Sequence, residues 1–248
     1  QNLKNTGVKI GDGVFVIPKH TLAVTHKEKQ YLKPLFEAQH CDKYHLNLNN
    51  THEIIYTTKK NCTIEKIPNL AKHLARFRDI MDKRRENING KLDFFHLHWA
   101  RDEKFFKQGE KILAVRKCID YPIFSYTSNE AYVLLSINII QTNRLDMKYL
   151  TGILNSKLIA FWLRYKGKMQ GNHYQIDKEP LLNIPIPKIT ESNQDLCDKI
   201  INLVEQILES KAKDSNADTT ELESQIDSLV YKLYNLTNKE IEIIESDS

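Results

Sequence analysis

Residues 149–188 read YLTGILNSKLIAFWLRYKGKMQGNHYQIDKEPLLNIPIPK. Apolar side chains in the first half have the spacing of a helix with one broad buried face, at Leu150, Ile153, Leu154, Leu158, Phe161, Trp162 and Tyr165. Asp146 or Asn143 is placed to cap the N-terminus of this helix, and Lys166-Gly167 is placed to end it. The stretch therefore predicts a single helix, with Phe161 and Trp162 in the core.

The segment from Lys166 to Gln175 reads as a polar, glycine-containing loop. Besides Lys166 and Lys168 it offers five hydrogen-bonding side chains, namely Gln170, Asn172, His173, Tyr174 and Gln175. Duplex DNA is bound by Lys and Arg at phosphates and by Asn, Gln, His, Lys or Arg at base edges. We interpret the loop as a DNA-binding element; the alternative is an ordinary exposed connection. A short helix over 178–182 and an extended Ile-Pro-Ile-Pro exit over 184–187 are predicted to follow.

The net charge of +4 conceals an asymmetry. Residues 191–248 contain 5 Lys and Arg against 14 Asp and Glu, whereas residues 1–190 contain 31 against 18. A basic body beside an acidic tail favours a polyanionic partner for the body. The alternative is a solvated basic surface without a partner.

Several classes of protein are disfavoured by composition. No apolar run is long enough for a membrane span, so no membrane partner is expected. Four dispersed cysteines form no CxxC pair, which disfavours disulfides and a zinc site and favours a reducing, cytoplasmic setting. The chain begins with Gln1 and has no basic-then-apolar leader, and we interpret it as a piece of a longer protein.

The rest of the body alternates strand and helix signals. A hairpin is predicted over 8–17, a strand over 53–58, and a helix that starts at Pro68 and ends in Lys83-Arg84-Arg85. Strands are predicted over 92–96, 111–115, 122–126 and 132–140, with one helical turn over 102–106. The order predicts an α/β (mixed α+β) fold with a mixed, largely antiparallel sheet and flanking helices.

The tail changes character after Pro187. Ser192 is predicted to cap one amphipathic helix, and Thr220 to Glu223 form a capping box for a second. Two such helices joined by a short polar loop predict an antiparallel helical hairpin. We therefore predict two domains, a basic body over 1–190 and a helical hairpin over 191–248.

Further basic candidates lie outside the loop. Arg116 and Lys117 follow the strand predicted over 111–115, and the others are Arg84, Arg85, Lys59 and Lys60. Each is placed to reach a phosphate. Solvated turns, and for the two arginines the charge preference of a helix end, explain the same residues without DNA.

The order in 149–188, a helix with Leu-Asn-Ser, a basic glycine-containing loop, a short helix and Pro-Ile-Pro, resembles the C-terminal target-recognition domain of type IIG restriction–modification enzymes and adenine-specific DNA methyltransferases. Type I restriction specificity subunits are more distantly similar. Segments 7–17, 31–36 and 68–89 look like further parts of the family. Glu37-Ala38-Gln39 departs from the Arg-Gly motif usual there.

The resemblance implies that residues 1–190 are a DNA target-recognition domain, which recognises a short sequence in duplex DNA. It also implies that the helical hairpin over 191–248 serves as a spacer or docking element. The recognition domain would position an N-terminal adenine methyltransferase, and an endonuclease, of the same parent chain; that family flips the target base. The parent would use S-adenosylmethionine and Mg²⁺, and no cofactor is expected in this chain. A protein-interaction or assembly module built on the helical hairpin is the alternative.

No active-site motif is evident. The Asn-Pro-Pro-Tyr and Phe-x-Gly-x-Gly motifs of the methyltransferases are absent, as are nuclease, phosphate-loop and nucleophile-elbow motifs. Asp102-Glu103-Lys104 is a charged triplet with nothing to position a metal, and His96 and His98 have no third ligand nearby. No catalytic residue and no metal site are predicted.

Overall fold

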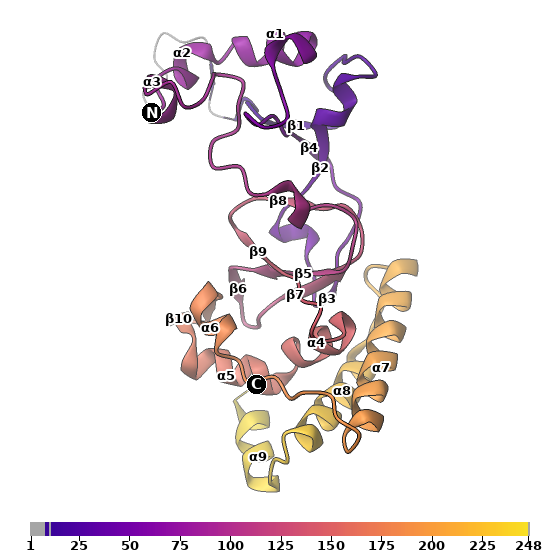
Figure 1. Cartoon of the computed structure of the whole chain (residues 1–248). Helices are drawn as coiled ribbons and strands as arrows, with labels where there is room; N and C mark the ends of the chain where they lie inside the picture. The colour runs from indigo at the N-terminus through magenta and orange to yellow at the C-terminus, as the bar shows by residue number, and fades with distance from the viewer. Residues whose placement is uncertain (1–7, 10, 248) are drawn as a thin grey trace. The chain divides into compact units, whose positions relative to one another are not determined.

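The computed structural model describes residues 8–9 and 11–247, which form two compact units. Unit 1 comprises Gln1–Leu35 and Asn50–Phe106, and unit 2 comprises Phe36–Asn49 and Lys107–Ser248. The chain therefore crosses between the units more than once before it ends in the helices of unit 2 (Figure 1).

Unit 1 is built on antiparallel strands with β4 in the middle. Its strands are β1 (Val16–Pro18), β2 (Leu32–Phe36, whose last residue belongs to unit 2) and β4 (His52–Ile55). β4 pairs with β1 on one side and with β2 on the other. The helices are α1 (Pro68–Ala75), α2 (Arg78–Met81) and α3 (Arg85–Ile88), with 3-10 turns η1 (Glu28–Tyr31), η3 (Ile64–Lys66) and η4 (Glu103–Phe105).

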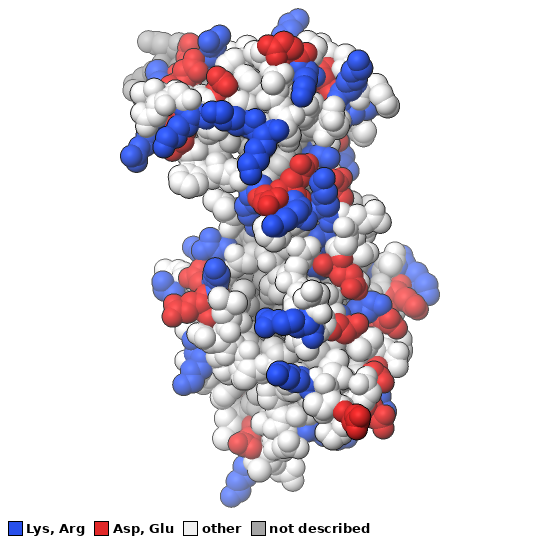
Figure 2. All heavy atoms as spheres, viewed as in Figure 1, with Lys and Arg blue, Asp and Glu red and all other residues white. Residues whose placement is uncertain are grey.

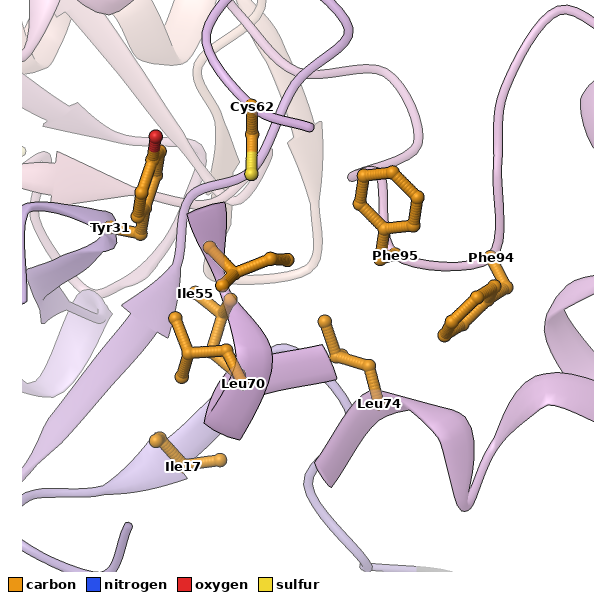
Figure 3. Packing of buried hydrophobic residues seen from close by; sticks show 9 residues of the cluster. Ile17, Tyr31, Ile55, Cys62, Leu70, Leu74, Phe94 and Phe95 are labelled. Carbon is orange, nitrogen blue, oxygen red and sulfur yellow. The ribbon is translucent and has the colours of Figure 1, made fainter. Parts of the chain in front are cut away.

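Helix α1 supplies the apolar face that covers this sheet. Leu70 and Leu74, one turn apart, are fully buried, and Leu70 lies over Ile55 of β4 and Ile17 of β1 (Figure 3). Each such leucine contributes about 1.5–3 kcal/mol on burial. The core of unit 1 consists of Ile17, Tyr31, Ile55, Cys62, Ile67, Leu70, Leu74, Phe94 and Phe95.

The N-terminus of α1 is held by a buried carboxylate from a distant segment. Oε1 of Glu28 accepts from the backbone N–H groups of Asn69 and Leu70 at 2.7 and 3.0 Å. Oε2 accepts from the backbone N–H and hydroxyl of Thr25, both at 2.9 Å, and from the Asn69 side chain at 2.8 Å. Negative charge at a helix N-terminus, where backbone N–H groups lack helical partners, is favourable.

Three predictions for unit 1 need correction. β1 pairs with β4 rather than forming a hairpin over 8–17, part of which lies outside the described residues. The helix that begins at Pro68, with proline at its first position, ends at Ala75 and is followed by α2 and α3. The strand predicted over 92–96 is irregular, because Asp93 to His96 form a turn in which Nδ1 of His96 accepts from the Asp93 backbone N–H.

Unit 2 is organised around β5 (Lys111–Val115), in which every residue is buried. Its sheet has the order β3-β7-β5-β9, where the others are β3 (Tyr44–His45), β7 (Phe124–Thr127) and β9 (Ile137–Ile140). β5 is antiparallel to both neighbours, and β3 is parallel to β7. Two shorter elements of this unit are η2 (Ala38–His40) and β8 (Tyr132–Val133).

The helix predicted in 149–188 is two helices, α4 (Met147–Leu154) and α5 (Lys157–Lys166). The break lies at Asn155, whose side chain exchanges two hydrogen bonds with the backbone of Phe124 on β7, at 3.2 and 2.8 Å. Ser156 then caps α5. Asp146 caps α4 by accepting from two backbone N–H groups, as predicted. A polar residue bound to the start of strand β7 thus interrupts an otherwise continuous apolar pattern.

The acidic tail packs on α4. It contains α7 (Gln194–Lys213), α8 (Thr220–Leu233) and α9 (Asn238–Ser246). Gly152 of α4 permits the close approach, because a Cβ there would lie 2.6 Å from Cγ2 of Ile200 on α7. The apolar stripes of α7 and α8 are buried at Cys197, Ile200, Val204, Ile207, Ile226 and Val230. Contacts therefore place the tail in unit 2 together with residues 107–190, while its role as a spacer or docking element stays a prediction.

Helix α5 begins against the tail. Its first backbone N–H, at Lys157, donates to Oδ1 of Asp227 on α8 at 2.8 Å. Lys157 and Arg164 of α5 also form ion pairs with Glu245 and Asp247. The tail is thus attached to both ends of the helix that leads into the segment at 166–175.

The predicted fold class is confirmed: the chain is mixed α/β with mostly antiparallel sheets. Strand 111–115, helix 178–182 and the helical turn near 102–106 lie where they were predicted, whereas 132–140 divides into β8 and β9. The N-cap positions of the first two tail helices are Asn193 and Thr219, and neither side chain accepts from a helix N–H. The predicted cap at Ser192 and the capping box from Thr220 to Glu223 were therefore wrong, although each helix begins within one residue of the expected start. All four cysteines are free and buried. No helix in the described part of the chain has the length and apolarity to span a membrane.

Candidate nucleic-acid interface

The segment predicted as a loop, Lys166 to Gln175, is a β-hairpin. Its strands are β10 (Lys168–Gln170) and β11 (His173–Gln175), which pair antiparallel with Gln170 opposite His173. Gly171 lies at the first position of the two-residue turn with φ +63°, a conformation that favours glycine. The prediction of a loop was wrong because strands of three residues give no readable alternation.

A third strand, β6 (Lys117–Ile119), completes a small sheet with the order β10-β11-β6. β6 is antiparallel to β11, with Lys117 opposite Gln175 and Ile119 opposite His173. Two further hydrogen bonds join the strand end to the hairpin turn. The backbone N–H of Asp120 donates to the Asn172 carbonyl at 3.1 Å, and the Asn172 side chain donates to Oδ1 of Asp120 at 2.7 Å.

The alternation of side chains gives this sheet two different faces. Cys118 and Tyr174 point inward and are 3% and 2% exposed. Burial raises the pKa of the Cys118 thiol to about 11, so the thiol is neutral. The opposite face, hereafter the hairpin face, consists of Lys117, Ile119, Lys168, Gln170, His173 and Gln175, all exposed except the half-buried Gln175.

The hairpin face therefore collects residues from two separate parts of the sequence. In the register of the strands, Lys117, Gln175 and Lys168 form one row. Ile119, His173 and Gln170 form the next row. The Gln175 side chain donates to Oε1 of Gln170 at 3.2 Å, which orders two amides on this face. Cationic side chains and hydrogen-bonding side chains are thus held side by side on a rigid backbone.

Tyr174 differs from the other candidates in this segment. Its hydroxyl accepts a hydrogen bond from Nε of Arg164 on α5 at 3.2 Å, and Arg164 in turn pairs with Asp247 at 3.2 Å. A ring that is 2% exposed is not presented to a ligand on the surface. Tyr174 therefore anchors the hairpin to α5, and its place among the predicted DNA contacts is corrected on that ground.

Two cations beside the hairpin face, Lys166 and Arg116, and Lys117 within it differ in whether their charged groups have partners. Lys166, the last residue of α5, and Lys117 are exposed. Arg116 is exposed too, but its guanidinium donates to Oδ1 of Asp177 at 2.8 Å and to the Leu135 carbonyl at 3.3 Å. A phosphate at Arg116 would have to compete with that carboxylate.

The remaining basic candidates belong to unit 1. The guanidinium of Arg84 donates to the carbonyls of His96, Asp93 and Met81 at 3.0, 3.2 and 3.2 Å. Arg84 and Arg85 begin α3 rather than ending a helix, so the predicted charge preference of a helix C-terminus does not apply to them. Arg85 is exposed.

Lys59 and Lys60 are exposed near the end of the segment that follows β4. Nζ of Lys59 lies 3.5 Å from the Lys91 carbonyl. Unit 1 as a whole carries 18 Lys and Arg against 10 Asp and Glu. Unit 1 is therefore basic, with an excess of 8 positive charges.

Acidic side chains are interspersed with basic ones on the face drawn in Figure 2. In unit 2 much of this mixture comes from the tail. Lys43 and Lys148 pair with Glu223 and Glu205, each at 2.5 Å. Tail carboxylates thus neutralise Lys43 and Lys148. The exposed cations near the hairpin are therefore a better guide to DNA binding than the total charge of unit 2.

A pocket of about 480 Å³ lies behind the hairpin in unit 2. Its lining includes Tyr121, half-buried Phe161 and the inward ring of Tyr174. The prediction that Phe161 and Trp162 are core residues was wrong in degree, because both are half-buried. The charged groups of the lining are largely paired with one another, as in Arg164 with Asp247.

Histidines and acids do not assemble a metal site among the residues that the structure describes. His96 is 3% exposed and lies in a turn, with Nε2 3.3 Å from the Cys62 carbonyl. His98 pairs with Glu86 at 2.8 Å. The two histidines thus have separate structural partners.

Ile119 is the residue of the hairpin face that the sequence did not indicate. It is 56% exposed and lies beside His173, at the end of its row on the edge strand β6. A strand over 117–119 follows β5 after a single residue, which left no turn signal in the sequence.

Comparison with known proteins gives a consistent result. The family described as the TaqI-like C-terminal specificity domain matches residues 33–186. Two type II methyltransferases of Haemophilus influenzae, M.HincII and M.HindII, are each 26% identical over an alignment of 190 residues that covers 71% of this chain. The chain spans 37% and 36% of their lengths, about a third of each.

A solved structure shares the fold. The type IIL restriction–modification enzyme MmeI, determined in complex with DNA, superposes with a TM-score of 0.66 at 12% identity. The superposition covers 92% of this chain and 32% of that one. The matched family segment contains the central sheet of unit 2, α4, α5 and the whole of the β10-β11-β6 sheet. The chain belongs to the TaqI-like C-terminal specificity domain family of restriction–modification enzymes.

Proposed function

We propose that this chain is the target-recognition module of a restriction–modification enzyme and that it binds duplex DNA through the hairpin face. The observation that carries the proposal is the register of β10, β11 and β6, which places Lys117 and Lys168 beside Gln170, His173 and Gln175. A narrow β-ribbon fits the major groove of B-DNA, where each base pair has a distinct pattern of donors and acceptors. The two lysines are exposed, whereas Gln175 donates to Gln170 and Nδ1 of His173 lies 3.2 Å from the Gln170 carbonyl. These three side chains would exchange those hydrogen bonds for contacts with base edges.

The side chains divide into two roles. Lys166, Lys168 and Lys117 would contact phosphates and fix the orientation of the sheet on the duplex. Gln170, His173, Gln175 and, at the turn, Asn172 would contact base edges. A glutamine amide matches the N6 and N7 groups of adenine, whereas histidine can donate or accept according to its tautomer.

Unit 1 would add phosphate contacts. Lys59, Lys60 and Arg85 are exposed and suit this role. Arg84 is bound by three carbonyls and would act by holding the α2–α3 turn. Arg116 would contribute only if it left Asp177.

The module would position a methyltransferase domain of the same parent chain on an adenine within the recognised sequence. Its relatives are methyltransferases about three times as long as the matched segment. Such a parent would use S-adenosylmethionine for methylation, would use Mg²⁺ if it also cleaves DNA, and would act in the cytoplasm. Recognition by this chain and catalysis elsewhere in the parent is therefore the proposed division of labour.

Selection from a randomised duplex DNA library with the purified chain, at low and at moderate salt, tests the proposal. We expect enrichment of one short motif that survives added salt, because base contacts are less salt-dependent than phosphate contacts. Binding that enriches no sequence motif and weakens steeply with salt would mean that the chain contacts phosphates without reading sequence. No binding at either salt would contradict the proposal.

Charge reversal tests the assignment of the hairpin. Lys166→Glu with Lys168→Glu should abolish binding to the selected duplex, a loss of at least about 100-fold, and leave thermal unfolding unchanged. Lys199→Glu with Lys239→Glu is the matched control, since both lysines are exposed on tail helices. Unchanged DNA affinity of the Lys166→Glu, Lys168→Glu variant, or an equal loss of affinity in both variants, would contradict the assignment of the hairpin as the DNA-binding element.

The alternative function, a protein-interaction or assembly module, was suggested by the apolar stripes of the helical hairpin, and these stripes are not exposed. The apolar stripes of α7 and α8 are covered inside unit 2, where α7 packs on α4 and β3. Deleting residues 191–248 would uncover the α4 face around Gly152 and remove the Asp227 cap of α5. Charge reversal is therefore a sharper test than truncation.

A further inference from the structure

The hairpin face has an apolar member, Ile119, which is 56% exposed. A single exposed isoleucine is ordinary on a protein surface, so its exposure alone has no functional meaning. Its position is more informative. In the strand register it lies directly opposite His173, which is in turn opposite Gln170. The residue two positions earlier on the same strand, Lys117, is on the same face.

The backbone around Ile119 is held on both sides. Asp120 follows it with φ +66° and exchanges two hydrogen bonds with Asn172 at the hairpin turn. The backbone N–H of Tyr121 donates to the Ile119 carbonyl at 2.8 Å. A β-branched side chain is also stiff at χ1. Ile119 is therefore presented outward at a fixed place, where it loses little conformational entropy on contact with a ligand.

The major groove has one apolar feature among its base-edge groups, the C5-methyl group of thymine. An aliphatic side chain beside hydrogen-bonding residues such as His173 suits that group. The lysines in the neighbouring row, Lys117 and Lys168, provide the charge complementarity to phosphates on either side of the groove. On the proposed function, the partner of Ile119 is consequently a base edge.

We propose that Ile119 contacts the C5-methyl group of a pyrimidine in the recognised sequence and sets specificity at that position. The inference rests on the proposed function and deepens it. Two bases carry this group, thymine and 5-methylcytosine. The interaction is packing of methyl against aliphatic carbon, and it excludes water from both.

The test uses the duplex enriched by selection. Each thymine is replaced singly by deoxyuridine, which removes the methyl group alone, and each cytosine is replaced singly by 5-methylcytosine. The whole chain should bind one deoxyuridine duplex about four- to tenfold more weakly, the effect of one buried methyl group. A gain of similar size with one 5-methylcytosine duplex would identify methylated cytosine as the source instead.

Substitutions at Ile119 test whether the effect of the methyl group on affinity depends on this side chain. Ile119→Ala should bind the unmodified duplex more weakly by the same factor and should no longer distinguish thymine from deoxyuridine at that position. Ile119→Val, which keeps a branched aliphatic side chain, should retain the distinction. Ile243→Ala is the matched control, because Ile243 is also 56% exposed but lies on α9. Thermal unfolding of each variant verifies that the fold is intact.

The outcomes separate this inference from the proposed function. A chain that binds its duplex but is indifferent to every methyl group overturns the role of Ile119 and leaves DNA recognition in place. Discrimination that persists in Ile119→Ala also overturns it. Absence of any binding by the unmodified chain overturns the proposed function, and the inference fails with it.

Discussion

The turn that carries Arg84 in unit 1 and the hairpin face in unit 2 are both polar, basic segments, yet they use their side chains differently. Arg84 donates to three carbonyls, which belong to a helix end and to the turn at 93–96. The strands β10, β11 and β6 satisfy one another instead. Buried or half-buried backbone groups need partners, and a side chain provides them where secondary structure does not. A basic residue is therefore available for DNA where the local backbone is already paired.

One helix in each unit, α1 in unit 1 and α5 in unit 2, begins at a buried carboxylate, and the pKa values of the two carboxylates are shifted in opposite directions. Burial opposes ionisation of Glu28, but hydrogen bonds from Thr25, Leu70 and Asn69 outweigh it and lower the pKa to about 2. Burial raises the pKa of Asp227 to about 6, although the Lys157 N–H and the charges of Lys43 and Lys157 favour the ionised form. The number of donors decides the difference, since desolvation acts on both in the same direction.

The largest expected effect is that of Glu28→Gln. The amide would turn a donor toward groups that already donate, so we expect unit 1 to lose about 2–4 kcal/mol of unfolding free energy at pH 7. Because the pKa of Glu28 is lowered on folding, its stabilisation is present above the unfolded pKa and is lost as pH falls toward 2. Hydrogen exchange of α1 amides measures the effect. Equal exchange protection of the α1 amides in the unmodified and Glu28→Gln proteins at pH 7 would contradict the stabilising role of the Glu28 carboxylate.

Asp227→Asn should act in the opposite direction. The raised pKa means that the folded state holds the proton more tightly, so the contribution of Asp227 falls as pH rises from about 4 to about 6. Asparagine keeps an acceptor for the Lys157 N–H and does not ionise. We expect a gain of about 1–3 kcal/mol at pH 7.5 and little change at pH 4. Urea denaturation at both pH values checks this, and a loss at pH 7.5 would contradict it.

The smallest expected effects on stability are those of substitutions at Arg84 and Arg85, which are neighbours in the sequence. Arg84→Ala should destabilise unit 1 by about 1–2 kcal/mol, because three carbonyls lose a charged donor. Arg85→Ala should change stability by less than about 0.5 kcal/mol and should lower the salt dependence of DNA binding by about one phosphate contact. Thermal unfolding and a salt titration of affinity separate the two. Similar stability losses would show that exposure does not distinguish these neighbours.

Several elements were predictable because their signals are local. Proline at the start of α1, the Asp146 cap of α4, strand 111–115 and helix 178–182 each follow from a few adjacent residues. The predicted continuous helix failed at Asn155, because its partner is the backbone of Phe124, 31 residues away. Periodicity cannot indicate such a partner.

The candidate site shows the same division. Lys168, Gln170, His173 and Gln175 could be selected from residue type, since DNA contacts require those groups. Their arrangement could not, because three-residue strands carry too little pattern for an alternation to be recognised. The sequence therefore did not indicate that the ring of Tyr174 is buried or that Ile119 is exposed on the same sheet.

By itself the sequence determined the chemistry that this protein presents, its family resemblance and the elements with capping or periodic signals. The tertiary structure alone decided which cations are free, since Arg84, Arg116 and Lys43 each have partners from other segments. It also decided that residues 117–119 join the hairpin, which creates the hairpin face. The physical reason is that hydrogen bonds and ion pairs between distant segments depend on backbone geometry, which local propensity does not specify.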